Sequence, residues 1–361
     1  MYPQIRIDLT KFRHNLRTLV GIAEKGSCSL MIVTKGFCAD PVLVDEILKN
    51  DSVRYLADSR VQNLKTYAEK VRGAGRETVL LRLPQLCEIE EVVRWADISQ
   101  NSEIGTIRLL NTEAERQGRM HKVILMIDEG DLREGMFYTD EDAILEVCRE
   151  ILSMKHIVFE GIGVNLTCYG AIIPRPENLG RLCALAEKIE KAFDIQLPIV
   201  SGGNSSSVYL IGTGELPARI SNLRLGESVI LGNDTANCVR IPDTFHDAFT
   251  LRAQIVELKR KPSLPIGDVG VDAFGEVPHY EDRGIITRAI LAVGKQDMNP
   301  DGLTPLDTKA EILGGSSDHL ILDVSAENCR LGDTVDFSLD YGALLKLFTS
   351  SYVERVYLGR E

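Results

Sequence analysis

A single lysine near the N-terminus stands where a reactive amine is expected. The apolar run from Leu30 to Thr34 is short and rich in β-favouring residues, and it stops at Lys35. This pattern predicts a strand buried on both faces of a parallel sheet, with Lys35 at its carboxyl end. A partly desolvated lysine amine has a lowered pKa and can form a Schiff base with an aldehyde. On this segment alone, a surface lysine that merely ends a strand is the alternative.

Polar or glycine-rich segments follow most of the other predicted strands. The segments 201–207 and 224–228 hold glycines and serines that can offer N–H and hydroxyl donors to a phosphate dianion, although a flexible turn is the alternative for the first of them taken alone. An amine for an aldehyde and donors for a phosphate are what pyridoxal phosphate requires of a protein. The full set of polar strand ends is Lys35, 58–60, Arg82, 128–133, 165–170, 201–207 and 224–228.

Short β-rich runs alternate with helical patterns over the first two thirds of the chain. Such repeated βα units predict an α/β fold, and eight parallel strands favour a closed (β/α)8 barrel of the TIM type. The predicted strands are 29–34, 53–57, 78–82, 97–99, 122–127, 157–164, 197–200 and 221–225. The helical stretches between them include 40–49, 59–71, 102–117, 140–153 and 176–193. The working face of such a barrel is the carboxyl end of its strands.

After about residue 238 the helical patterns fade and period-two alternation takes over. Segments 249–258, 321–324 and 334–337 alternate apolar and polar residues, and Pro and Gly fall between them. This texture predicts a small C-terminal antiparallel β domain. The opening segment 5–9 alternates as well and is expected to join that domain. We therefore expect a barrel over 10–237 and a β domain made of 1–9 and 238–361.

Composition limits the classes of partner. The net charge of −12 argues against binding to nucleic acid or to an anionic membrane surface. No stretch approaches the roughly 20 apolar residues of a membrane span, and the N-terminus has no secretory h-region, so a cytoplasmic protein is expected. The eight cysteines are scattered without a Cys-x-x-Cys pair, and the six histidines show no ligand spacing. We expect no metal site and no disulfide framework.

Motifs in a shared order along nearly the whole chain identify a family. The sequence resembles the alanine racemase family, and most closely its alanine/ornithine racemase branch. The matching pieces are 33–35, 127–135, 203–205, 223–226, Ser317-Asp318 ahead of 320–324, and Tyr341 ahead of 355–357.

The resemblance implies a role for each matching residue. Lys35 would bind pyridoxal phosphate as a Schiff base and serve as one of two acid/base groups at the substrate Cα. Arg224 would face the pyridine nitrogen, where an arginine weakens the electron sink because it keeps its own proton; a structural salt bridge is the alternative for Arg224. The other implied cofactor-binding positions are Asn165, Asn204, Ser205, Gly226, Glu227 and Tyr341, and the substrate positions are Arg133, Ser317 and Asp318.

The acid/base group opposite Lys35 departs from the family pattern. Alanine racemases place a tyrosine after a glycine of the small domain, where this chain reads Gly294-Lys295-Gln296-Asp297. Racemisation needs proton exchange on both faces of the carbanion, so Lys295 is the first candidate for the opposite base. A solvated surface lysine is the alternative. His319 is the reserve candidate.

Further departures argue against an alanine-specific pocket. Asn165 stands where the family has a histidine stacked on the cofactor ring, and Met126 replaces the lysine that can be carbamylated. Acidic side chains near the expected substrate face could receive a distal ammonium, which fits a basic substrate such as ornithine or lysine. These acidic residues are Asp131, Glu134, Asp297 and Asp318.

The sequence therefore predicts a pyridoxal phosphate-dependent amino acid racemase, most closely one for ornithine, that forms a homodimer with shared active sites. A decarboxylase of the same architecture is one alternative, although such enzymes generally set a glutamate where Arg224 stands. A non-catalytic pyridoxal phosphate-binding protein is the other, although single-barrel proteins of that kind lack a second domain.

Overall fold

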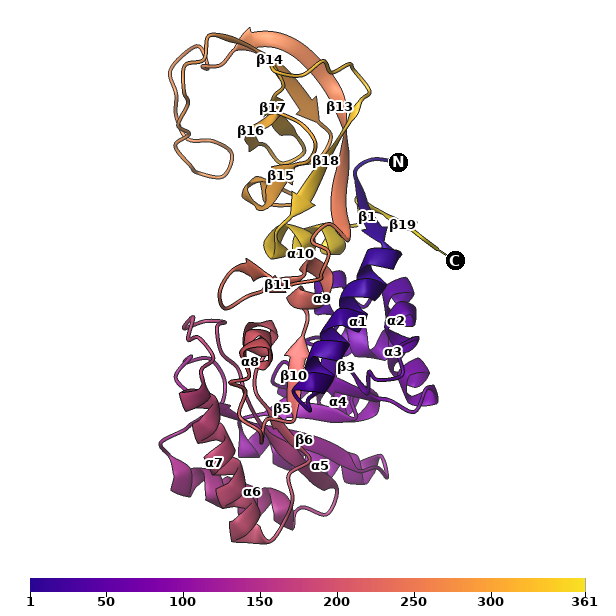
Figure 1. Cartoon of the computed structure of the whole chain (residues 1–361), viewed down its shortest axis with the longest axis vertical. Coiled ribbons are helices and arrows are strands. Elements are labelled where there is room, and N and C mark those ends of the chain that lie inside the picture. Colours follow the sequence, from indigo (N-terminus) through magenta and orange to yellow (C-terminus); the bar gives the residue numbers. More distant parts are fainter. Residues whose placement is uncertain (361) are drawn as a thin grey trace. The chain divides into compact units, whose positions relative to one another are not determined.

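The computed structural model describes residues 1–360, which divide into two compact units (Figure 1). One unit spans residues 12–245. The other combines residues 1–11 with the chain from His246 onward.

The unit of residues 12–245 is a closed parallel barrel, as the sequence predicts. Its strands run in the order β5-β4-β3-β2-β10-β9-β8-β6, and pairing between β5 and β6 closes the ring. A short strand, β7 (Met136–Phe137), extends the sheet beside β6. The barrel strands are β2 (Ser29–Val33), β3 (Tyr55–Asp58), β4 (Glu77–Leu80), β5 (Ile98–Asn101), β6 (His121–Asp128), β8 (Ile157–Val164), β9 (Ile199–Ser201) and β10 (Asn222–Leu225).

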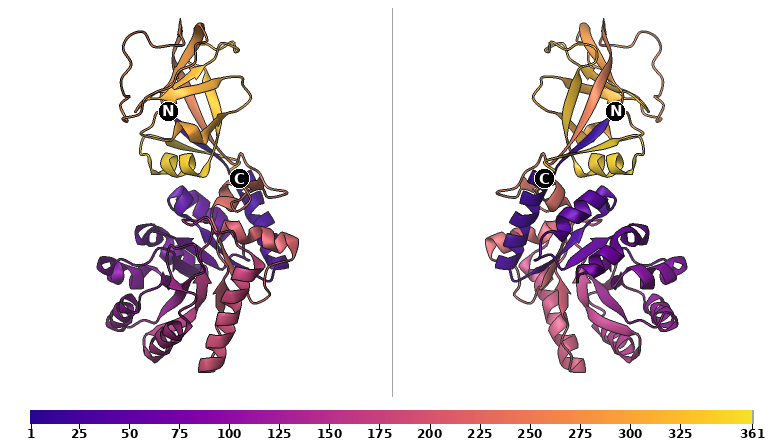
Figure 2. Two further views of the ribbon diagram at one scale, coloured as in Figure 1. Left: turned by 90° about the vertical axis from the view of Figure 1, so that its left-hand side faces the viewer. Right: turned by 90° about the vertical axis from the view of Figure 1, so that its right-hand side faces the viewer.

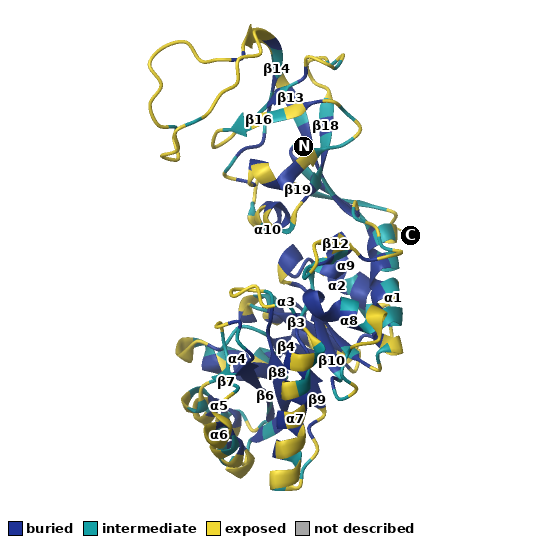
Figure 3. Ribbon diagram, turned by 60° about the vertical axis from the view of Figure 1, so that its left-hand side comes forward, coloured by how far each residue is buried: buried dark blue, intermediate teal, exposed yellow. Residues whose placement is uncertain are grey.

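Helices surround these strands (Figure 2). Figure 3 shows the strands buried and the outer faces of the helices exposed. Local signals set the helix ends: the carboxylate of Asp40 accepts the N–H groups of Val42 and Leu43 at the start of α2, where Pro41 is the first helical residue. The helices are α1 (Leu9–Lys25), α2 (Pro41–Leu48), α3 (Val61–Gly73), α4 (Ile89–Trp95), α5 (Ile104–Arg116), α6 (Glu141–Ser153), α7 (Pro176–Phe193), α8 (Val208–Thr213) and α9 (Glu227–Leu231).

The barrel interior is filled by side chains rather than open. Alternate residues of the strands, such as Ile124 and Met126 of β6, pack into one buried cluster, because residues two apart lie on the same face of a strand. Strands β8 and β9 approach so closely that a Cβ at Gly161 would lie 1.8 Å from the carbonyl oxygen of Ile199. Reactive groups must therefore lie at the strand ends.

The second unit is an antiparallel β structure, which confirms the predicted fold class. Strand β1 pairs antiparallel with β13 and parallel with β19. A helix, α10 (Tyr341–Thr349), interrupts the strands, although the fading helical pattern after residue 238 predicts none. Asp340 caps it by accepting the N–H of Ala343 at 2.7 Å. The strands are β1 (Gln4–Asp8), β13 (Phe249–Pro262), β14 (Ile285–Leu291), β15 (Leu303–Pro305), β16 (Glu311–Gly315), β17 (Leu320–Asp323), β18 (Thr334–Leu339) and β19 (Glu354–Leu358).

Candidate active site

Lys35 stands directly after β2, at the start of a short 3₁₀ turn (Lys35–Phe37). Its side chain keeps contact with solvent, yet the protein around it removes enough water to lower the pKa of its amine. A lowered pKa is the direction that a nucleophilic amine requires. The groups that interact electrostatically with this amine are Cys168, Arg133, Asp58 and Arg224.

Arg224 lies on β10, next to β2, and is buried. Its Nη1 donates to the hydroxyl of Ser201 at 2.6 Å, and its Nη2 donates to the carbonyl of Val164 at 2.8 Å and to Oδ1 of Asn165 at 3.4 Å. Burial lowers the pKa of Arg224 to about 10. Within residues 1–360 these guanidinium bonds go to neutral oxygens, which gives no support to a structural salt bridge. The guanidinium is oriented and stays charged at neutral pH.

Asn165, in the loop after β8, is bonded to the loops after β6 and β9 and to Arg224 of β10. Its Oδ1 accepts from Asn204 at 3.0 Å as well as from Arg224, and its Nδ2 donates to Glu134 at 3.3 Å. Asn204 also donates to the carbonyl of Leu166 at 2.9 Å. The structure thus brings together Asn165, Asn204 and Arg224, three of the residues that the sequence places at the cofactor.

The loop after β9 is rich in hydrogen-bond donors. It forms a 3₁₀ turn (Ser205–Ser207) that leads into α8, and Gly203 enters it at φ +109°, where a Cβ would lie 2.8 Å from the hydroxyl of Ser207. Ser205 accepts from the N–H and the hydroxyl of Ser228 at 3.3 and 3.0 Å. The hydroxyl of Ser206 is buried and has no partner among the described residues. Since an unpartnered buried hydroxyl costs free energy, this donor set fits an anionic ligand such as a phosphate.

Gly226 lies beside the end of β2. A Cβ on Gly226 would be 3.3 Å from Cβ of Val33, two residues before Lys35. Gly226 precedes α9, whose first residue is Glu227, so amide N–H groups at this helix start are close to the strand end that carries the lysine.

The loop after β6 carries Arg133. Oδ1 of Asp128 accepts the N–H groups of Gly130 at 2.9 Å and Leu132 at 3.1 Å, which folds the loop back. The exposed guanidinium of Arg133 pairs with the carboxylate of Glu134 and contacts the thiol of Cys168. The pair occupies Glu134, so this carboxylate is not open to a substrate ammonium.

Asp131 is also occupied. Its buried carboxylate accepts backbone N–H groups of the loop after β8, from Tyr169 at 2.9 Å, Ile172 at 3.1 Å and Cys168 at 3.5 Å. Asp131 therefore ties the β8 loop to the β6 loop, which sequence reasoning did not anticipate. It also brings Cys168 against Arg133, and the only signal for that cysteine was its place within segment 165–170.

The remaining predicted site residues belong to the second unit, where two loops join. The N–H of Lys295 donates to the carbonyl of Ser316 at 2.8 Å, and a Cβ on Gly294 would lie 2.2 Å from the carbonyl oxygen of Ser317. Lys295 and the Ser317-Asp318 segment are thus brought together. Nζ of Lys295 lies 3.6 Å from the carboxylate of Asp272.

Other candidates of this unit differ in exposure. Asp318 and His319 are exposed. Asp297 is buried and accepts the hydroxyl of Ser350 at 2.7 Å, so it is already bonded within the protein. Tyr341 is the first residue of α10.

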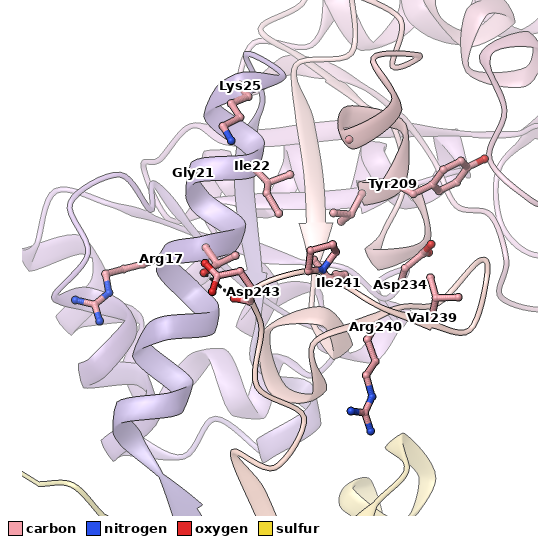
Figure 4. Close-up of a pocket in the computed structure, with 14 residues that line it drawn as sticks. Arg17, Gly21, Ile22, Lys25, Tyr209, Asp234, Val239, Arg240, Ile241 and Asp243 are labelled. Carbon is pink, nitrogen blue, oxygen red and sulfur yellow. Dashed lines mark hydrogen bonds between the residues drawn. The ribbon is translucent and has the colours of Figure 1, made fainter.

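A cavity of about 550 Å³ in the barrel unit lies elsewhere (Figure 4). It is lined by residues of α1, such as Lys25, by Tyr209 of α8, and by the hairpin of β11 (Asn233–Asp234) and β12 (Val239–Arg240). None of the predicted site residues lines it. The chemistry of the side chains therefore favours the strand ends over this cavity as the functional site.

Residues 1–360 contain neither a metal-ligating cluster nor a membrane-spanning helix. Among them no group of three or more His, Cys, Asp or Glu side chains could hold a metal ion. In the same part of the chain, no helix is long and apolar enough to cross a membrane.

The structure is a two-unit protein with a parallel barrel and a lysine of lowered pKa at a strand end, and solved structures share this fold. An alanine racemase from Streptomyces lavendulae has a TM-score of 0.75 at 17% identity, covering 99% of this chain and 97% of its own. An alanine racemase from Bartonella henselae with covalently bound pyridoxal phosphate has a TM-score of 0.72 at 15% identity, covering 99% and 100%.

The sequence comparisons show the family. Residues 7–233 match the model of the alanine racemase N-terminal domain, and this chain belongs to that family. An ornithine racemase from Acetoanaerobium sticklandii is 52% identical over 357 residues, 98% of this chain and 99% of that protein. A lysine racemase from Thermotoga maritima is 37% identical over 360 residues, 99% of each.

Proposed function

We propose that this chain is a pyridoxal phosphate-dependent racemase of a basic amino acid and that its preferred substrate is ornithine. The 52% identity to an ornithine racemase over nearly the full length supports the substrate. The observation that carries the cofactor is the position of Lys35 directly after β2, with the buried guanidinium of Arg224 on the neighbouring strand β10. The lowered pKa of Lys35 agrees with this assignment. When bound, the cofactor withdraws electrons from the substrate and makes its Cα–H bond acidic.

The barrel residues fit this cofactor. Lys35 would attach to its aldehyde, and the hydroxyls of Ser205 and Ser206 with the amides of Gly226 and Glu227 would hold its phosphate. The unpartnered buried hydroxyl of Ser206 supports this assignment, because a phosphate oxygen would complete its hydrogen bonding.

Arg224 limits how strongly electrons are withdrawn. We place its guanidinium at the ring nitrogen, to which it would donate a hydrogen bond while keeping its own proton. A carboxylic acid at that position could protonate the nitrogen, as a decarboxylase of this fold requires, and Arg224 therefore favours simple proton exchange. Asn165 holds the guanidinium on one side, and Ser201 holds it on the other.

Proton exchange needs one group on each face of the substrate. Lys35, with its lowered pKa, would take or give the proton on one face. We assign the opposite face to Lys295, supplied by a second copy of the chain in a homodimer, with His319 in reserve. The carboxylate of Asp272 and the ring of Phe274, 4.2 Å from Nζ, hold this ammonium in place.

We assign the substrate carboxylate to Arg133, which would exchange its pairing with Glu134 for the substrate, and the distal ammonium to Asp318, with Ser317 beside it. Of the four acidic residues considered for the ammonium, Asp131, Glu134 and Asp297 are already bonded within the protein, whereas Asp318 is exposed.

Incubation of the loaded protein with L-ornithine in deuterated water tests the proposal. The expected products are D-ornithine and L-ornithine that carry deuterium at Cα. Release of carbon dioxide instead would mean a decarboxylase, and bound cofactor without turnover of any amino acid would mean a binding protein. Replacement of Lys35 by alanine should abolish the visible absorbance of the covalently bound cofactor, and its persistence would refute the assignment.

The Lys295→Ala variant tests the opposite face, with His319→Ala as the matched control in the neighbouring loop. We expect Lys295→Ala to retain deuterium exchange from one enantiomer of ornithine and to lose net racemisation, because Lys35 still serves its own face. Retention of net racemisation in Lys295→Ala, with its loss in His319→Ala, would transfer the role to His319.

A further inference from the structure

A buried hydrogen-bonded group lies behind Lys35 on residues that the proposed chemistry does not use. Asp58 ends β3 and is fully buried, as is Thr34. Tyr67 is nearly so. The hydroxyl of Thr34 donates to Oδ2 of Asp58 at 2.6 Å. The hydroxyl of Tyr67, on α3, lies 3.0 Å from that of Thr34. These three side chains form one buried chain of hydrogen bonds.

The carboxylate of Asp58 has further donors. It accepts the N–H of Arg60 at 2.8 Å and the side-chain amide of Asn63 at 3.1 Å on each oxygen. Burial raises the pKa of Asp58, and the hydrogen bonds from Thr34, Arg60 and Asn63 oppose that rise. Burial is the larger effect, so the pKa of Asp58 lies above its ordinary value, while the surrounding donors favour the ionised form.

Thr34 immediately precedes Lys35, so its anchoring fixes the backbone from which the lysine extends. Its own N–H donates to the carbonyl of Ala57 at 2.8 Å, which ties the ends of β2 and β3 together. The side-chain bond to Asp58 adds a second tie at the same point. Two bonds at one residue hold the start of the lysine side chain in a single place.

Charged and titratable groups face the lysine amine from several elements. Arg224 on β10 and Arg133 after β6 are cations and disfavour its protonated form, as burial does most strongly. Cys168, after β8, and Asp58, on β3, act in the opposite direction. Tyr67 reaches this group only through Thr34. Among these groups that act on the lysine amine, Asp58 is the carboxylate.

We propose that Asp58 is a positioning residue for Lys35: it fixes the backbone at Thr34 and supplies a buried negative charge on the β3 side of the lysine. A racemase runs in both directions, so its lysine must exist in protonated and in neutral form during each cycle. Burial and the two arginines favour the neutral form, and Asp58, together with Cys168, favours the protonated one. This role of the Asp58 charge in setting the protonation of Lys35 rests on the proposed racemase function.

The test is the titration of the Lys35 amine in the full chain without cofactor. A small acylating reagent modifies neutral amines, and mass spectrometry of the peptide that contains Lys35 gives the rate at each pH. In Asp58→Asn the pH midpoint of the Lys35 titration should fall by roughly half a unit to one unit. At a pH below the midpoint, Lys35 should then react about three- to ten-fold faster than in the wild type. The asparagine amide can donate to Thr34, whose hydroxyl can then donate to the carbonyl of Ala57, 3.2 Å away.

Tyr67→Phe is the matched control, because it removes a buried hydroxyl from the same group and keeps the charge. Its midpoint should stay at the wild-type value. An unchanged or raised midpoint in Asp58→Asn, or an equal shift in both variants, would overturn the proposal. Asp58→Ser, smaller and also neutral, carries the same comparison if the asparagine variant does not fold. Since no turnover is measured, failure of racemisation would show separately in the deuterium assay.

Discussion

The tie between the two strand-end loops gives a sharp prediction about Asp131. Both of its oxygens accept backbone N–H groups of the β8 loop: Oδ2 from Tyr169, and Oδ1 from Ile172 and Cys168. In Asp131→Asn one oxygen becomes an NH₂ group, which cannot accept. At least one N–H then loses its partner, and the others lose a charged one.

The magnitude follows from these bonds. A hydrogen bond to a charged group contributes roughly 1.5–3 kcal/mol, which corresponds to an opening equilibrium about 10- to 150-fold larger. The loop depends on its anchor, because Thr167 and Ala171 both adopt φ of +54°, a left-handed conformation that costs on the order of 1 kcal/mol for each such residue. We expect exchange of the loop amides to accelerate by this factor, with racemisation reduced because Cys168 and Arg133 lose their fixed contact.

Hydrogen exchange of peptides that cover residues 167–172 is the assay, and Asp128→Asn is the control. Asp128 accepts both of its recorded N–H groups on the same oxygen, so an asparagine oxygen can accept both, and exchange should change by only a few-fold. Unchanged exchange in Asp131→Asn, or the same acceleration in both variants, would refute the reasoning.

Three further predictions follow from buried groups. Burial lowers the pKa of His121 from 6.5 to about 4, so between these pH values the unfolded chain takes up a proton that the folded chain does not. The free energy of unfolding should therefore fall by up to about 3 kcal/mol as the pH drops from 6.5 to 4. Urea titrations of His121→Gln should lack this loss. Arg224→Lys cannot bond Ser201 and a backbone carbonyl together, so fluorescence titration should show roughly ten-fold weaker pyridoxal phosphate binding, and wild-type affinity would contradict its orienting role. Gly161→Ala sets a Cβ 1.8 Å from a carbonyl oxygen and should lower the midpoint of thermal unfolding severely. Gly163→Ala should lower it slightly, because the nearest neighbours of its Cβ are side chains at 3.3 Å or more. Equal effects of the two variants would be inconsistent with the packing of β8.

The barrel could be predicted because each parallel strand is a short run buried on both faces. The predicted strand 157–164 coincides with β8. The prediction 197–200 is displaced from β9, because Pro198 precedes this strand and a Ser/Gly-rich segment follows it. Helix α10 was missed because strand-like alternation dominates that region, although Asp340 before it is an ordinary helix start.

The site was predictable where a charged residue ends an apolar run. Lys35 directly follows a buried strand, and Arg224 lies within one, where a buried charge is costly unless it has a use. The partners behind them were not predictable, since the bond between Thr34 and Asp58 depends on the lateral pairing of β2 with β3. The residues next to Thr34 and Asp58 in the sequence do not specify that pairing.

The pairing of β1 has a consequence for synthesis. Its two neighbours are β13 and β19, so the first strand of the chain lies beside one of the last, with residues 12–245 between them in sequence. A ribosome completes those barrel residues before it makes either partner. The barrel can therefore fold while the N–H and C=O groups of β1 are still unpaired. In a nascent chain released before Glu354, the edge of β1 that pairs with β19 would be open to pairing with other chains.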